Sequence, residues 1–344
     1  MFVVSFFILL GAGCVSIQTG STSAGGGVFK SVDRGKAWLS KVLMPTTTGQ
    51  PKSIAGVNVL TLVFDPQDNR AIYLGSGGNG LLYTYDGGES WLSSPSLSRG
   101  AVPSVAVDPS EKCTIYTAFE NKVLKTTDCA RSWQIMFFET KLEKLITAVA
   151  VDLNNREIVY AGNNNGDILK STDGGVSWTT IARTGSNIKD ILTARYNSQI
   201  VYVATEGEGI WKTINGGKNW KDLKSTVKEY NGSLEYGKLI FDQTANETLL
   251  LASRYGILKT SNGGENWSVV KLLTAAGSTK IYGLAVGPKN GNEIYYTSAT
   301  TFYKTVNGGM DWMTKKLPSN RIGRILTIDP RDPDVIYMGM WSAQ

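Results

Sequence analysis

Histidine is absent from this 344-residue sequence, and cysteine occurs only three times. Without histidine the chain cannot form a Ser-His-Asp triad, a Cys-His pair or a histidine-ligated zinc site. The cysteines Cys14, Cys113 and Cys129 are too far apart to form a Cys-x-x-Cys motif. The catalytic chemistry that remains is that of carboxylates, which glycoside hydrolysis uses in pairs. We expect neither a metal nor a cofactor.

Long blocks of like charge are also missing, and the formal net charge is only +6. Spread over a chain of this length, that charge favours solubility and gives a mild preference for anionic partners. The sequence contains no nucleic-acid-binding motif, so we expect no DNA or RNA partner.

A hydrophobic run occurs only at the start of the chain, in Phe2–Leu10, and it is too short for a membrane span. It is typical of the apolar region of a secretory signal, predicted over residues 1–13. The stretch Leu10–Cys14 resembles a bacterial lipoprotein signal, in which the cysteine is lipidated. The alternative is an ordinary signal peptide cut nearby. The Ser/Thr/Gly-rich residues 14–26 are predicted to be a flexible tether, and residues 27–344 one folded domain in a periplasmic or cell-surface location.

One eight-residue pattern recurs along the domain: Ser/Thr-x-Asp/Asn-x-Gly-x-x-Trp, called the box below. Ser171–Trp178 is a clear copy, and Thr126–Trp133 is a variant with Ala130 at the glycine position. The acidic or amide residues of the seven copies are Asp33, Asp86, Asp128, Asp173, Asn215, Asn262 and Asn307. The tryptophans are Trp38, Trp91, Trp133, Trp178, Trp220, Trp267 and Trp312. A period of 42–53 residues between tryptophans is the signature of a repeat architecture.

The residue types of the box predict a tight hairpin turn. An Asp or Asn side chain can accept hydrogen bonds from backbone N–H groups two residues further on. Glycine adopts the positive φ that such turns need without a steric cost. We expect the tryptophan to start the next strand and to pack against a neighbouring repeat. The box is therefore predicted to be structural.

The segments between the boxes predict four short strands per repeat. In Pro103–Phe137, apolar runs alternate with turn signals such as Asp108-Pro109. Four strands in about 40–45 residues is typical of a propeller blade. The C-terminus supplies two strands and the N-terminus supplies two more, which together complete one blade. We predict an all-β, seven-bladed β-propeller in which Phe29-Lys30 pairs with Ile336-Tyr337.

The seven boxes resemble the bacterial neuraminidase repeat, or Asp-box, family. That family includes sialidases, oligoxyloglucan-type glycoside hydrolases, the sortilin-type ectodomain and the photosystem II assembly and stability factor. The resemblance covers nearly everything after residue 26 and implies a propeller, but the same blades carry hydrolases and non-enzymes. The chain resembles the single-propeller photosystem factor in size, export and lipid anchor. The Arg-Ile-Pro sequence of sialidases is absent, and xyloglucan hydrolases normally use two propellers.

Cys113 and Cys129 are predicted to fall at the same end of one strand hairpin. A disulfide between them is compatible with that geometry and with an oxidising compartment. The alternative is a pair of free thiols.

The topology also predicts which face binds a partner. Box turns and Asp-Pro turns lie on one face, so the connections between second and third strands and between blades lie on the other, called the top face. Candidate binding residues there are Lys189, Asp190, Glu206, Tyr236, Lys238, Arg254, Tyr255, Tyr282, Arg321 and Arg324. We expect a monomer that binds a protein partner through this face without catalysis. A glycoside hydrolase or carbohydrate-binding propeller is the alternative.

Overall fold

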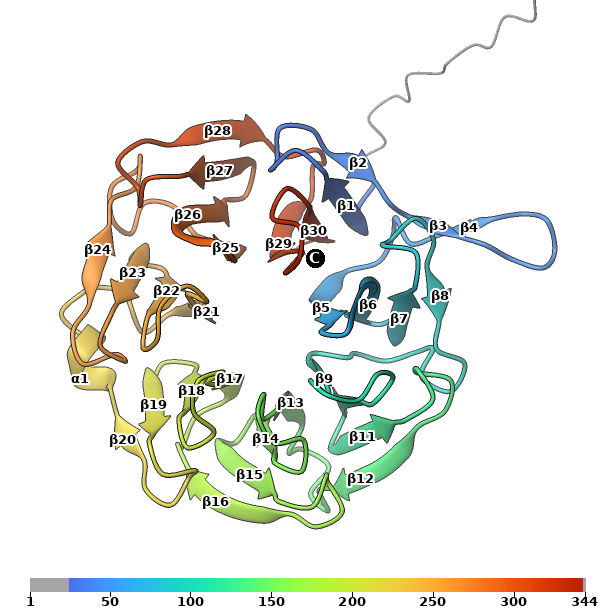
Figure 1. Cartoon of the computed structure of the whole chain (residues 1–344), viewed down its shortest axis with the longest axis horizontal. Coiled ribbons are helices and arrows are strands. Elements are labelled where there is room, and N and C mark those ends of the chain that lie inside the picture. The colour runs from blue at the N-terminus through green and yellow to red at the C-terminus, as the bar shows by residue number, and fades with distance from the viewer. Residues whose placement is uncertain (1–24, 343–344) are drawn as a thin grey trace, which may run out of the picture.

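Seven four-stranded antiparallel sheets, arranged like the blades of a propeller around a common axis, make up most of the computed structural model (Figure 1). The model describes residues 25–342. The predicted signal (1–13), Cys14 and nearly all of the predicted tether lie outside the described residues. The prediction of a seven-bladed all-β propeller is confirmed.

Each blade runs from an innermost first strand to an outermost fourth strand. Blade 1 contains β5 (Val59–Asp65), β6 (Asp68–Ser76), β7 (Leu81–Thr84) and β8 (Leu92–Ser93). Blade 2 contains β9 (Val105–Val107), β10 (Ile115–Phe119), β11 (Lys122–Thr126) and β12 (Gln134–Phe138). Blade 3 contains β13 (Ile146–Val151), β14 (Val159–Asn163), β15 (Asp167–Ser171) and β16 (Thr179–Arg183). Blade 4 contains β17 (Ile188–Thr193), β18 (Val201–Thr205), β19 (Ile210–Thr213) and β20 (Lys221–Asp222).

The remaining blades follow the same order. Blade 5 contains β21 (Tyr236–Phe241), β22 (Leu249–Ser253), β23 (Ile257–Thr260) and β24 (Ser268–Val270). Blade 6 contains β25 (Leu284–Gly287), β26 (Asn290–Thr297), β27 (Thr301–Thr305) and β28 (Met313–Lys316). Blade 7 combines β29 (Ile322–Ile328) and β30 (Ile336–Trp341) with β1 (Val28–Ser31) and β2 (Leu39–Ser40).

Blade 7 closes the ring by joining the two ends of the chain. In the register of β1 and β30, Lys30 lies opposite Tyr337 and Phe29 lies opposite Met338. The predicted pairing of the N-terminal and C-terminal strands is therefore confirmed. Closure removes two exposed sheet edges, which would otherwise be free to pair with other chains.

The hydrophobic core is divided among the seven junctions between blades. Each of seven clusters combines side chains from two neighbouring blades, as where Tyr202 and Leu258 join blades 4 and 5. The second strands β14, β18 and β22 are buried at every position, because a blade covers each of their faces. The outermost strands are mostly exposed. No blade has a core of its own, so each depends on its neighbours.

The boxes form the predicted turns. In blade 3, the Ser171 hydroxyl donates to the Asp173 carboxylate over 2.7 Å, and the Gly175 N–H donates to the Ser171 oxygen over 2.8 Å. The Ser177 N–H donates to the same carboxylate over 2.9 Å. Gly174 has φ +69° and Gly175 φ +95°, where an added Cβ would be strained. One detail differs from the sequence prediction: Trp178 precedes the fourth strand instead of starting it.

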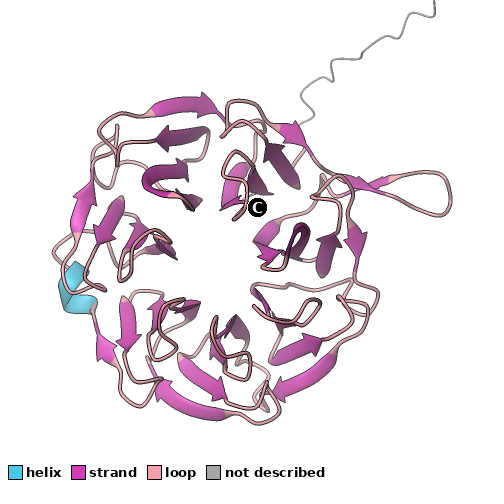
Figure 2. Ribbon diagram, in the orientation of Figure 1, coloured by secondary structure: helices cyan, strands magenta, loops and turns pink. Residues whose placement is uncertain are grey.

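Two insertions interrupt the repeat. The hairpin β3 (Leu43–Met44) and β4 (Lys52–Ser53) projects from the ring between blades 7 and 1, and accounts for the longest interval between tryptophans (Figure 1). The short helix α1 (Lys224–Val227) lies between blades 4 and 5, and is the only helix in the described part of the chain (Figure 2). Within residues 25–342, no helix is long and apolar enough to cross a membrane.

Candidate functional site

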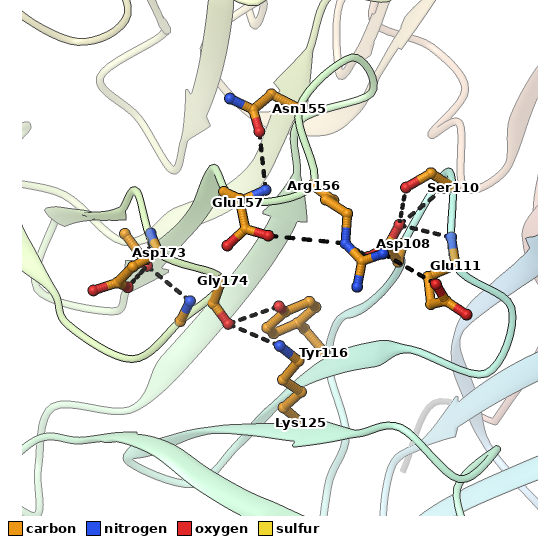
Figure 3. Close-up of polar contacts among 12 residues, drawn as sticks. Asp108, Ser110, Glu111, Tyr116, Lys125, Asn155, Arg156, Glu157, Asp173 and Gly174 are labelled. Atoms are coloured by element: carbon orange, nitrogen blue, oxygen red, sulfur yellow. Dashed lines mark hydrogen bonds and ion pairs between the residues drawn. The ribbon is translucent and has the colours of Figure 1, made fainter.

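The box face is held together by contacts from one blade to the next. Figure 3 shows the junction of blades 2 and 3, where the Tyr116 hydroxyl and the Lys125 ammonium both donate to the carbonyl oxygen of Gly174, over 2.8 and 3.0 Å. Arg156 lies 3.1 Å from Glu111 and 3.4 Å from Asp108, which belong to the preceding blade. These polar groups at the junction of blades 2 and 3 are thus used within the protein.

We call this Tyr-Lys pair the latch. At the junction of blades 7 and 1, Tyr337 and Lys30 bond the carbonyl oxygen of Gly87 over 2.7 and 3.0 Å. Lys170 reaches the carbonyl of Gly216 in the same way over 2.7 Å. Sequence reasoning missed the latch, although a lysine precedes the box in six of its seven copies. These lysines are Lys30, Lys125, Lys170, Lys212, Lys259 and Lys304.

On the top face, the innermost strands share a β-bulge near their first residue. The strand pairing skips Leu60, Thr147, Lys189, Gly237 and Arg324, one residue in each of five blades. A bulge re-aims the side chain of the unpaired residue. Lys189 and Arg324 therefore occupy equivalent positions near the centre of the ring, as their place on the innermost strands β17 and β29 indicates (Figure 1).

Carboxylates pair with Lys189 and Lys238, two of the five predicted top-face cations. Lys189 lies 2.8 Å from Glu206, and this hydrogen bond lowers the pKa of Glu206. Asp190 accepts hydrogen bonds from Lys238 and from the Tyr236 hydroxyl, both over 2.6 Å. Burial, reinforced by the Asp190 charge, raises the pKa of Tyr236, so this phenol stays protonated at neutral pH.

Arg324 has no carboxylate partner among the described residues. Its guanidinium lies over the ring of Trp341, 4.5 Å from the ring centre. The residue is exposed to solvent, yet desolvation by the surrounding protein lowers its pKa. The guanidinium is thus partly desolvated and still accessible to solvent. Trp341 is a site residue that the sequence analysis missed, although it lies opposite Ile322 at the end of the last strand.

The other predicted residues are distributed around this centre. Glu206, Tyr236 and Arg254 line one cavity of about 550 Å³, together with Glu235, Ser253 and Lys280. Arg254 lies 3.5 Å from Glu235. Tyr255 packs edge to face on Tyr230, and Tyr282 lies beneath the Lys280 ammonium. Arg321 donates to the carbonyl oxygen of Gly56 over 3.3 Å. The structure thus brings three predicted residues into one cavity and leaves Tyr255, Tyr282 and Arg321 outside it.

Residues 25–342 are predicted to contain no metal site and one pair of bridged or free cysteines. No group of three or more acidic or cysteine side chains is placed to hold a metal ion there. Cys113 and Cys129 form a disulfide, with their Cα atoms 4.1 Å apart. The predicted pairing is confirmed, and the bridge fixes the box of blade 2, in which Cys129 stands at a glycine position.

Part of the chain is similar in sequence to known families. Residues 166–257 match the model of the sortilin family, described as sortilin, neurotensin receptor 3. A probable oligoxyloglucan-reducing end-specific xyloglucanase of Neosartorya fischeri is 36% identical over 86 residues. That match covers 25% of this chain and 10% of the fungal protein, so the chain spans a small part of the relative's length.

Similar folds are found in a xyloglucanase and in a protein bound to a peptide. A glycoside hydrolase family 74 xyloglucanase of Xanthomonas campestris superposes with a TM-score of 0.65 at 13% identity, over 83% of this chain and 51% of that one. YCF48 in complex with a D1 peptide superposes with a TM-score of 0.61 at 19% identity, over 87% of this chain and 95% of that one. At these identities the likeness concerns the fold alone. The chain is a seven-bladed β-propeller that resembles sortilin-type, xyloglucanase-type and YCF48-type propellers, and its seven boxes are consistent with the Asp-box repeat.

Proposed function

We propose that this protein is an exported, lipid-anchored binding platform whose top face captures an acidic segment of a partner protein. The observation that carries the proposal is Arg324, a desolvated guanidinium on Trp341 without a carboxylate partner among the described residues. A carboxylate brought there would make charge-assisted hydrogen bonds with it. The peptide complex of YCF48, a propeller of matching size, supports peptide binding as a use of this fold.

The carboxyl groups of the chain support binding over hydrolysis. A glycosidase needs an acid whose pKa is raised, so that it is protonated at working pH. The pKa values of two top-face carboxyl groups, Asp167 and Glu206, are instead lowered. At Asp167, burial acts to raise the pKa, but the hydrogen bonds from Lys144, Asn163 and Arg183 and the charge of Lys144 together outweigh it.

A carbohydrate-binding or hydrolytic propeller remains the second candidate. It is favoured by the sequence match to a xyloglucanase and by the two carboxylates, Glu206 and Glu235, that line the 550 Å³ cavity. Release of the chromophore from sialyl and β-glucan reporter sugars, lost in Glu206→Gln or Glu235→Gln, would establish this candidate over the binding platform.

The binding proposal is tested with a fluorescein-labelled, glutamate-rich peptide. We expect its anisotropy to rise with the protein and to fall with added salt, since the contact is ionic. Arg324→Glu should weaken binding at least about tenfold, as expected for loss of a charge-assisted contact. The matched control is Lys218→Glu, an equal charge change in an exposed box residue. Equal affinities for Arg324→Glu and the parent would overturn the proposal.

Export and anchoring rest on separate observations. The disulfide Cys113–Cys129 supports an oxidising compartment, and Cys14 follows the apolar start of the chain. We expect Cys14→Ser to move the protein from the membrane to the soluble fraction, because a single lipidated residue would be its anchor. Retention of Cys14→Ser in washed membranes, at the parent's level, would rule out lipid anchoring.

A further inference from the structure

The box face carries a cationic cavity at the junction of blades 6 and 7. Its volume is about 170 Å³, and its lining includes Arg34, Lys36, Lys304 and Lys315 but no carboxylate among the described residues. A cavity with this lining has a positive potential and favours an anion. It lies on the face opposite Arg324, so it is separate from the proposed capture of an acidic segment.

Two of the four cations are left without an ion pair. Buried Glu293 lies 3.5 Å from Arg34 and 3.4 Å from Lys304, and Arg34 also lies 2.5 Å from Asp334. The ion pairs of the described residues include neither Lys36 nor Lys315, both of which are exposed. The nearby Asp33 carboxylate accepts hydrogen bonds from Ala37 and Ser31, keeps its negative charge and attracts Lys315. Four cations at the cavity thus face three carboxylates, Asp33, Glu293 and Asp334, so one positive charge is left uncompensated.

This junction also departs from the latch found elsewhere. Arg34 stands where five other boxes have glycine, and it keeps the left-handed backbone, with φ +58°. Lys304 lies beside Glu293, whereas the equivalent lysines of blades 2, 3 and 7 bond a glycine carbonyl. A bulky residue is strained at positive φ, so its presence indicates that its side chain has a role at that position. Here the replacement adds a guanidinium to the cavity wall.

The size and the lining of the cavity limit the kind of ligand that it can bind. Drug-sized ligands occupy pockets of about 300–1,000 Å³, so this cavity suits a small group. The ring of Phe302 and the thioether of Met313 line it beside the cations. Arginine and lysine together match a tetrahedral oxyanion, since guanidinium forks and ammonium groups both donate to phosphate.

We propose that this cavity binds a phosphate group, either free or as the headgroup of an anionic lipid. Exposed apolar side chains near the cavity favour the lipid headgroup. Met313, which lines the cavity, is 59% exposed. Met310 (75% exposed) and Leu39 (57% exposed) each lie three residues along the chain from a lining residue. Apolar side chains mixed with lysines are typical of surfaces that rest on anionic membranes.

The test uses full-length chains that carry Cys14→Ser, so that no acyl chain contributes to vesicle binding. The test variant is Lys36→Gln with Lys315→Gln. The control is Lys218→Gln with Lys316→Gln, which makes the same charge change at an equivalent box position and at the next residue of β28. All four lysines are exposed, so each variant is expected to fold, as its thermal melting will show.

Two binding experiments distinguish free phosphate from a lipid headgroup. Calorimetric titration with inorganic phosphate tests the free anion, and co-sedimentation with phosphatidylglycerol or phosphatidylcholine vesicles tests the lipid. We expect binding in at least one arm, with phosphatidylglycerol preferred over phosphatidylcholine, and a loss of about tenfold in the test variant alone. Binding in neither arm, or an equal loss in the control, would overturn the proposal. Arg324→Glu should leave phosphate binding and vesicle binding unchanged. The proposal for the cavity and the proposal for the top face can therefore be contradicted independently.

Discussion

Asp173 shows at the scale of one residue why the box is structural. Its carboxylate accepts the Ser171 and Ser177 hydroxyls and the Ser177 N–H, so its lone pairs are committed to the turn. These hydrogen bonds lower the pKa of Asp173 to about 2, and the bond from the Ser177 hydroxyl has the largest effect. A side chain so engaged has little capacity left for a ligand.

We expect Asp173→Ala to lower the melting temperature by roughly 1–3 °C. The shift is small because the entropy of unfolding is large for a chain of this size, so the loss of one turn changes the melting temperature little. Asp173→Asn should cost less, since three boxes already use asparagine. Binding of the acidic peptide should be unchanged in both variants. Loss of peptide binding by a folded Asp173→Ala protein would place a functional contact on the box face.

At the scale of the element, four boxes contain an aspartate, which titrates, and three contain an asparagine, which does not. The pKa values of Asp33, Asp86, Asp128 and Asp173 are all lowered in the folded state. A lowered pKa stabilises the fold fully above the unfolded value of 3.8, and this contribution is lost as the pH falls towards 2. Boxes with asparagine contribute no such dependence.

Replacing all four aspartates by asparagine should therefore flatten the fall of the melting temperature between about pH 4 and 2. Asp68, Asp167 and Glu206, whose pKa values are also lowered, account for the slope that remains. The reciprocal control, Asn215→Asp with Asn262→Asp, should steepen the fall. Identical pH profiles for parent and both variants would show that the boxes do not set the acid limit.

The box of blade 2 depends on a covalent bridge in place of glycine chemistry. Cys113, Cys129 and Ala130 all have positive φ, at +70°, +60° and +69°. The disulfide closes a separation of 16 residues, and a loop of that size contributes about 3 kcal/mol to stability.

Cys113→Ala with Cys129→Ala should lower the free energy of unfolding by about 2–4 kcal/mol, measured by chemical denaturation. Cys129→Gly in place of Cys129→Ala should recover about 1 kcal/mol, because glycine adopts the left-handed backbone without strain. Stability that is unchanged by the double alanine variant, and by reductant in the parent, would exclude a stabilising role for the bridge.

The elements were predictable where the repeat is strict. The box specifies the third and fourth strands, and the half-units at the two ends predicted that Phe29-Lys30 pairs with Ile336-Tyr337, as β1 and β30 do. The site was less predictable, because ion pairs such as Asp190–Lys238 join strands of different blades. Strand order placed Lys189, Lys238 and Arg324 on one face but did not show which would be neutralised. That difference depends on where Glu206 and Asp190 lie in space.

At the scale of the whole molecule, stability depends on ring closure. Each of the seven core clusters lies between two blades, so an open ring loses a complete cluster and exposes two edges. Deletion of residues 27–40 removes β1 and β2 from blade 7. We expect this deletion to abolish cooperative folding or to lower the melting temperature strongly.

The matched control for the deletion is removal of residues 46–50, the exposed tip of the β3–β4 hairpin. Because this tip lies outside the ring, its loss should leave the melting temperature nearly unchanged. A deletion of 27–40 that melts like the parent would contradict closure through blade 7.

The central claim is that binding uses the top face while the box face maintains the ring. Hydrogen–deuterium exchange with and without the glutamate-rich peptide tests it most directly, because it reports the protection of each segment. The account predicts slower exchange in Asn187–Asp190, Glu235–Lys238 and Arg321–Ile325, with the seven boxes unchanged. Slower exchange in the box turns, with the three top-face segments unaffected, would contradict it.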